Sequence, residues 1–198
     1  MAEITAQAVN EFRKKTGLGL MECKALLKEA DGDVQKAETL AKERGLKKAE
    51  LRAGRAAKAG RIEVYIHHDA KQGTMIELNC ETDFVARNDE FKQLAKDLAL
   101  HIMAANPLYV RREDVPEADV AEQKRIFMSQ VADKPPNIQE KIADGKLSAW
   151  YGETVLLDQK FVKDDTKTVK EVIIAVNART GENISVARFA RFVVGEGR

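Results

Sequence analysis

The spacing of apolar residues changes at Arg61, and this change limits the fold that the chain can adopt. In the first 45 residues, before Arg61, apolar residues recur at intervals of three and four, which is the spacing of one face of a helix. Directly after it, Ile62, Val64 and Ile66 alternate with more polar residues, which is typical of a half-buried strand. Helical spacing returns further along the chain. The sequence therefore predicts an α+β fold, with N-terminal helices and a small sheet that begins near Arg61.

The first 45 residues predict three short helices. Thr5 can cap the first helix, which ends at Gly17, because a threonine hydroxyl accepts bonds from free amide groups and glycine tolerates the left-handed conformation at a helix end. The second helix ends at Gly32, and Asp33 caps a third that ends at Gly45. A unit of this size buries few side chains, so we expect a docking module.

Residues 42–61 form a strongly basic segment. It holds eight basic and two acidic side chains, a local net charge of 8 − 2 = +6. The basic residues are Lys42, Arg44, Lys47, Lys48, Arg52, Arg55, Lys58 and Arg61. One interpretation is a solvated, partly helical linker, and the other is a contact with RNA or an acidic surface. The segment has no aromatic side chain on which a base could stack, which favours the linker.

The residues after Arg61 predict a β-hairpin followed by a helix. A polar turn at 68–73 joins the first strand to a second one. The residues of the second strand that face inward are expected to be Ile76, Leu78 and Cys80. A helix is expected from about Asp89 to Asn106, because apolar residues recur there at helical spacing and Pro107 lies beyond its end.

Two charged helices at about 117–132 and 137–149 have sparse apolar positions. Such helices suit a protruding antiparallel helical hairpin, at about 117–149. Thr168 and Glu171 form a capping box for a further helix. The chain closes with a strand from Ile184 to Val194, whose alternation slips in the middle and so predicts a bulge.

The overall composition limits the class of protein. The formal net charge is 33 − 32 = +1, which argues against a dedicated polyanion binder. The two cysteines cannot form a disulfide framework, and this usage suits a reducing compartment. We find neither a signal-peptide pattern nor a run of about 20 apolar residues. We therefore expect a cytoplasmic protein.

Sequence signatures of enzymes are mostly absent. The chain has no phosphate-binding loop, complete dinucleotide fingerprint, CxxC or HExxH motif. His67-His68-Asp69 is better explained as a polar hairpin tip than as a metal site, because adjacent strand residues point to opposite faces. Cys80 has the inward phase of its strand and is expected to be a core residue. We therefore expect no enzymatic activity, no metal and no cofactor.

The segment from Cys80 to Asp89 carries Phe84 and Val85 between charged neighbours, where a short polar connection is expected. In one interpretation, the segment is a loop folded back over the sheet edge with Phe84 buried. In the other, it presents an apolar wedge to a partner protein, because binding energy at interfaces is concentrated in aromatic and arginine anchors.

Two motifs of this chain resemble those of one known family. Residues 82–88, TDFVARN, look like the TDFVA(K/R)(N/D) signature of elongation factor Ts. Residues 16–26, TGLGLMECKAL, resemble the N-terminal signature of the same family, and the closing strand at 191–197 is similar as well. The resemblance covers essentially the whole chain. It implies a nucleotide-exchange factor of translation elongation whose partner is elongation factor Tu.

The resemblance also implies a domain organisation. We expect a ubiquitin-associated-like three-helix domain at 1–45, a basic linker at 46–60 and an α+β core at 61–198. In that core, an antiparallel sheet packs on helices and carries the helical hairpin. Longer members of the family duplicate the strand–helix core, whereas this chain has room for one copy. Short members tend to pair, and the three or so strands per chain would leave open edges, so a homodimer is expected.

Partner-binding residues are carried over from the family motif. They are Thr82, Asp83, Phe84, Val85, Ala86, Arg87 and Asn88. Phe84 is expected to insert between helices of the partner's GTPase domain, with Asp83 as its charged neighbour. The loop around them is expected to disturb the magnesium and phosphate sites. Leu20 and Met21 are expected to dock on the same domain. His101, Phe161 and Val162 align less clearly with other family contacts. The alternative function is an RNA-associated or scaffolding protein that uses residues 42–61.

Overall fold

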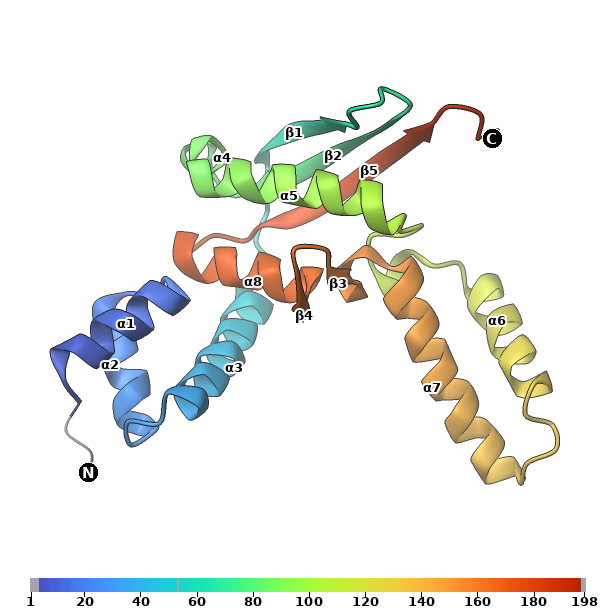
Figure 1. Ribbon diagram of the computed structural model, residues 1–198, viewed down its shortest axis with the longest axis horizontal. Helices are drawn as coiled ribbons and strands as arrows, with labels where there is room; N and C mark the ends of the chain where they lie inside the picture. Colours follow the sequence, from blue (N-terminus) through green and yellow to red (C-terminus); the bar gives the residue numbers. More distant parts are fainter. Residues whose placement is uncertain (1–3, 53, 197–198) are drawn as a thin grey trace. The chain divides into compact units, whose positions relative to one another are not determined.

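The computed structural model describes residues 4–52 and 54–196 and combines helices with a small sheet (Figure 1). The helices are α1 (Ala6–Thr16), α2 (Leu20–Glu29), α3 (Val34–Arg52), α4 (Asp83–Arg87), α5 (Asp89–Ala105), α6 (Glu117–Ser129), α7 (Pro136–Thr154) and α8 (Val169–Thr180), with 3-10 turns η1 (Arg112–Asp114) and η2 (Leu156–Asp158). The strands are β1 (Ala59–Ile66), β2 (Gln72–Cys80), β3 (Lys160–Phe161), β4 (Asp164–Thr168) and β5 (Ser185–Val193). The predicted α+β class is confirmed.

The chain forms two compact units. Unit 1 takes in the described residues of 1–60, 79–92 and 173–185, and unit 2 those of 61–78, 93–172 and 186–198. The predicted division into 1–45, 46–60 and 61–198 stays a prediction. None of the helices in the described part of the chain is long and apolar enough to cross a membrane.

The N-terminal helices of unit 1 share one small apolar core. Its buried members are Val9, Phe12, Leu18, Cys23, Leu26, Leu27, Ala30 and Ala37, and Ala178 of α8 packs against them. Thr5 caps α1 as predicted, since its hydroxyl accepts a bond from the Ala8 amide at 3.2 Å. Gly17 ends α1 with a φ of 71°, a conformation in which glycine carries no steric penalty.

The third helix does not end at Gly45, contrary to the prediction. It continues to Arg52, although a glycine inside a helix costs about 1 kcal/mol relative to alanine. Tertiary contacts offset that cost. Lys48 pairs with Glu22 at 2.5 Å, and Arg52 donates to the carbonyl oxygen of Asn177 at 3.1 Å. The N-terminal half of the basic segment is therefore helix held against α2 and α8.

In unit 2, α5 covers one face of a sheet with the strand order β1-β2-β5 (Figure 1). Ile76 and Leu78 of β2 are completely buried, as predicted, and so are Leu98 and Ile102 of α5. Cys80, in the part of β2 that belongs to unit 1, is also completely buried, as predicted. The hydroxyl of Thr74 donates to the carbonyl oxygen of Ala99 at 2.8 Å, which fixes the register of helix on strand.

The apolar residues of β1 lie on the open side of the sheet, contrary to the prediction of a half-buried apolar face. Ile62, Val64 and Ile66 are exposed, whereas Arg61 and Glu63, which pair at 2.8 Å, are the more covered residues. A period of two shows which residues share a face but not which face lies against the core. The described chain thus leaves an apolar strand face uncovered.

Helices α6 and α7 run side by side as the predicted hairpin (Figure 1). Lys124 pairs with Asp144 at 2.9 Å, and Lys146 donates to Gln130 at 2.5 Å. The second helix continues to Thr154, beyond the expected end at 149. Val155, which follows it, is completely buried.

Strands β3 and β4 pair antiparallel and precede α8. This short pair was not expected from the sequence. Thr168 and Glu171 form the predicted capping box of α8: the Thr168 amide donates to Glu171 Oε2 at 2.8 Å and the Glu171 amide donates to Thr168 Oγ1 at 3.2 Å. The predicted bulge in the last strand stays a prediction.

A buried histidine links α5 to the β3–β4 pair in unit 2. His101 is completely buried, and its Nδ1 accepts a bond from the Val162 amide at 3.2 Å. Its Nε2 therefore carries the proton and donates to Oε1 of Gln159 at 2.9 Å. Burial lowers the pKa of His101 below its ordinary 6.5, although the Gln159 bond acts in the opposite direction.

The core of unit 1 can be tested by comparing two apolar residues. Phe12→Ala is expected to lower the free energy of unfolding by about 3–5 kcal/mol, because it leaves a cavity in a small core. Met21→Ala is expected to change it by less than about 0.5 kcal/mol, because Met21 is 76% exposed. Urea unfolding followed by circular dichroism measures both. Equal losses would contradict this assignment of the core.

His101 should make stability depend on pH. As pH falls below the ordinary 6.5, the unfolded chain takes up a proton at His101 that the folded chain does not yet bind, so stability is lost. The free energy of unfolding of the wild type should therefore fall more steeply than that of His101→Asn as pH is lowered toward about 5. Urea titrations at several pH values would measure this, and parallel profiles would contradict it.

Candidate functional site

The segment 82–88 folds as a short helix, α4, that presents a bare aromatic side chain. Sequence reasoning expected a loop here, but Asp83–Arg87 is helical. Phe84 is 89% exposed, and Ala86 is the buried residue of this helix. This exposure excludes the interpretation in which Phe84 is buried over the sheet edge.

Hydrogen bonds at both ends explain why α4 is helical, one to a side chain and one within the backbone. At the N-terminus, Thr82 Oγ1 accepts a bond from the Val85 amide at 3.5 Å. At the C-terminus, the Asn88 amide donates to the Val85 carbonyl at 3.0 Å. The side chain of Asn88 then accepts from the Glu90 amide at 2.9 Å, which begins α5. Residue 88 thus ends one helix and starts the next.

The charged residues of α4 are free to turn toward a partner. Asp83 and Arg87 lie one helical turn apart, with 4.0 Å between their charged atoms, and both side chains are at least 75% exposed. An ion pair so exposed contributes at most about 1 kcal/mol to stability. Neither charge is therefore committed to holding the fold.

Glu182, in the turn after α8, contacts the N-terminus of α4. Its Oε2 accepts bonds from the amides of Glu81 and Thr82, both at 3.1 Å, and its Oε1 accepts one from the Thr82 hydroxyl at 2.5 Å. Sequence reasoning missed Glu182, because about a hundred residues separate it from α4 and nothing in one sequence pairs the two segments.

Neighbouring residues reinforce this contact. The Asn183 amide donates to Glu81 Oε1 at 2.7 Å, and the Asn183 side chain donates to the carbonyl oxygen of Arg55 at 3.0 Å. Arg55 in turn lies 3.5 Å from the carboxylate of Glu81. The residues before α4 are therefore held by side chains from two distant parts of unit 1.

Cys80, at the end of β2, is not set up as a nucleophile. Burial raises the pKa of its thiol to about 11, and the carboxylates of Glu182 and Asp83 push it in the same direction. Its sulfur donates to the Thr82 carbonyl at 3.2 Å. Because the thiolate is the reactive form, this thiol is inert near neutral pH.

Unit 1 exposes two further apolar candidates. Leu20 and Met21 begin α2 directly after Gly19, and both are exposed. They add nothing to the three-helix core, whose α2 members are Cys23, Leu26 and Leu27. They are therefore free to contact a partner.

The remaining candidates belong to unit 2 and differ in accessibility. His101 and Phe161 are buried, and their rings stack with centroids 5.9 Å apart. A partner cannot contact His101 directly in this conformation. Val162 is about half exposed, so it is the member of this group that is open to a partner.

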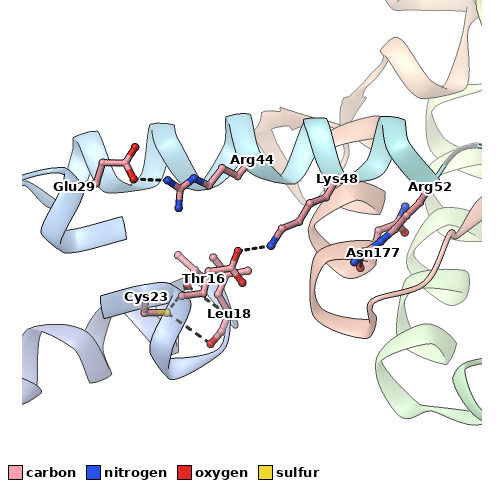
Figure 2. A network of polar contacts seen from close by, with 9 residues as sticks. Thr16, Leu18, Cys23, Glu29, Arg44, Lys48, Arg52 and Asn177 are labelled. Carbon is pink, nitrogen blue, oxygen red and sulfur yellow. Dashed lines mark hydrogen bonds and ion pairs between the residues drawn. The ribbon is translucent and has the colours of Figure 1, made fainter. Parts of the chain in front are cut away.

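The basic residues of α3 are partly used within unit 1, as Figure 2 shows. Arg44 pairs with Glu29, and Arg52 reaches the Asn177 carbonyl. Lys48 pairs with Glu22. These contacts reduce the positive charge available to RNA and explain part of the unusual composition of residues 42–61.

No metal centre is found in the described part of the chain, where no group of three or more His, Cys, Asp or Glu side chains could hold an ion. The rings of His67 and His68 nevertheless lie 4.2 Å apart. The expectation that they point to opposite faces does not hold, because both residues follow the last residue of β1. Nδ1 of His67 is bonded to the Tyr65 hydroxyl at 3.1 Å.

Comparison with known proteins identifies the family. The family model described as "Elongation factor TS" matches residues 6–196. The chain is 52% identical over 194 residues to elongation factor Ts of Thermodesulfovibrio yellowstonii, covering 98% of this chain and 97% of the relative. It is 47% identical over 195 residues to that of Thermotoga maritima, covering 98% of each. The match to Geobacter sulfurreducens elongation factor Ts is 50% over 196 residues, covering 98% of this chain and 91% of the relative. Together with an exposed TDFVARN helix, these matches show that the chain belongs to the elongation factor Ts family.

Proposed function

We propose that this chain is a guanine-nucleotide exchange factor for elongation factor Tu and that α4 is its working element. One observation carries the assignment of the site: Phe84 is 89% exposed on a helix that the fold holds in place. An exposed aromatic residue with flanking charges is the kind of anchor that dominates protein interfaces.

The exchange follows from linked binding equilibria. If the chain binds the GTPase more tightly without nucleotide than with it, then the bound chain must weaken nucleotide binding by the same factor. Insertion of Asp83 and Phe84 between helices of the partner's GTPase domain would disturb its magnesium and phosphate sites and so supply that difference, because the magnesium charge holds the phosphates. The chain makes and breaks no covalent bond, so we propose that it is not an enzyme.

The free energy gained by burying one side chain limits how much of the exchange activity Phe84 can explain alone. Burial of one phenylalanine is worth about 1.5–3 kcal/mol, which is roughly one to two decades in an equilibrium constant. Larger accelerations need further contacts. Leu20 and Met21, which are exposed in the same unit as Phe84, are suited to supply them.

The site is tested by the release of a fluorescent GDP analogue from elongation factor Tu. The wild-type chain should accelerate release, and Phe84→Ala should reduce the acceleration by about 10- to 100-fold, as expected from the loss of one buried aromatic contact. The circular dichroism spectrum should not change, because Phe84 adds almost nothing to the core.

Leu51→Ala is the matched control, because Leu51 is 83% exposed in the same unit but lies outside the candidate site. This variant should accelerate GDP release as much as the wild type does. Full acceleration by Phe84→Ala would move the site elsewhere. No acceleration by the wild-type chain at any concentration would contradict the function itself.

We further propose that the chain pairs with a second copy through the open face of its sheet. The residues of this face are Ile62, Val64, Ile66, Met75, Phe192 and Val194, all of them exposed. All of them except Ile62 line a shallow groove of about 320 Å³. An apolar face of this kind on one chain can be covered by the same face of another, related by a two-fold axis.

Val64→Asp tests the pairing by placing a charge on the open face of the sheet. Sedimentation velocity should show a dimer for the wild type and a monomer for the variant, because the carboxylate cannot be buried unpaired. Leu108→Asp is the matched control, since Leu108 is exposed in unit 2 but belongs to no strand and does not line the groove. A monomeric wild type would contradict the proposal.

A further inference from the structure

We propose that Glu182 is a positioning residue for exchange: its carboxylate holds the N-terminus of α4 and so sets the direction in which Phe84 points. This inference rests on the function proposed above and deepens it. Glu182 itself is not expected to touch the partner's nucleotide site. Its contribution would be made entirely through α4.

Helix α4 is too short to hold its own conformation. A helix of five residues is far below the length at which helices persist in water. Its burial is confined largely to Ala86, while Asp83, Phe84 and Arg87 are exposed. Its conformation must therefore be stabilised by contacts at its ends.

Both oxygens of the Glu182 carboxylate bind the residues at the start of α4. It accepts from two consecutive amides, of Glu81 and Thr82, through one oxygen and from the Thr82 hydroxyl through the other. Charge-assisted bonds of this kind are about twice as strong as neutral ones. One side chain thus fixes both the backbone and the capping residue at the start of α4.

The Thr82 hydroxyl binds Glu182 and the Val85 amide at the same time. That group has a single hydrogen, which it donates to Glu182, so its lone pairs remain for the Val85 amide. The carboxylate therefore orients the cap as well as holding it. Without Glu182 the hydroxyl could rotate, and the long 3.5 Å bond to Val85 would lose its alignment.

The same turn is itself anchored on the other side. Asn183 bonds to Glu81 and to the carbonyl oxygen of Arg55. Asn183 and Ile184 are buried. Glu182 is thus attached to a fixed point of unit 1, which a positioning residue requires.

A measurement on the free chain tests whether Glu182 holds α4. Hydrogen–deuterium exchange of a peptide that covers 81–88 should become at least about tenfold faster in Glu182→Ala, because local opening becomes easier. Peptides from α1 and α2 should keep their wild-type rates. Unchanged exchange in 81–88 would overturn the proposal, and this arm needs no partner protein.

A double-mutant cycle tests whether Glu182 acts through Phe84. In the wild-type background, Phe84→Ala should cost about 10- to 100-fold of the acceleration of GDP release. In the Glu182→Ala background, Phe84→Ala should reduce the acceleration of GDP release only a few-fold further, because the Phe84 side chain is already misplaced. If the fold-loss of the double variant equals the product of the fold-losses of the two single variants, Glu182 does not act through Phe84 and the positioning role is overturned.

Two variants serve as controls. Glu171→Ala removes a carboxylate that caps the opposite end of α8 and does not contact α4, so it should leave exchange and the 81–88 peptide unchanged. Glu182→Gln keeps one oxygen that can accept the two amides and should retain more exchange activity than Glu182→Ala. Equal losses in Glu182→Ala and Glu171→Ala would indicate a general stability effect and overturn the proposal.

Failure of the proposed function can be told apart from failure of this inference. A wild-type chain that does not accelerate GDP release contradicts the exchange function, whatever the amide measurements give. An active wild type with faster amide exchange in Glu182→Ala, but with undiminished GDP release by that variant, contradicts the positioning role alone.

Discussion

Burial of β2 against α5 is the interaction on which the rest of unit 2 depends. Ile76 and Leu78 on the strand and Leu98 and Ile102 on the helix are all completely buried. Because side chains alternate along a strand, committing one face of the sheet to α5 turns the other face toward solvent. One helix cannot cover both faces, and the bare apolar residues on β1 follow from this arrangement.

Local signals in the sequence predicted those elements whose ends are set by nearby residues. The cap at Thr5, the capping box at Thr168 and Glu171 and the extent of α5 were all recognised, because each depends on residues a few positions apart. The buried phase of β2 was also found, since Ile76, Leu78 and Cys80 alternate without interruption.

Contacts between distant segments could not be predicted. The helix that continues through Gly45 is held by Glu22 and by the carbonyl oxygen of Asn177, which no local rule includes. The uncovered face of β1 was missed because a period of two does not say which side meets the core. The contact between Glu182 and α4 joins segments about a hundred residues apart. The motif could therefore be identified from the sequence, whereas the contact with Glu182 that holds it in place could not.

Because Phe84 is exposed, its substitution should affect the stability of the fold and the activity of the protein to very different extents. This side chain is almost entirely in water, so its solvation is nearly the same in the folded and the unfolded chain and it contributes little to the free energy of unfolding. A mutational scan scored by the amount of folded protein in cells would accept almost any residue at this position. Under the proposed function, a scan scored by growth would instead lose most substitutions of Phe84. Positions at which the two scans differ would then outline the proposed binding surface without a structure of the complex.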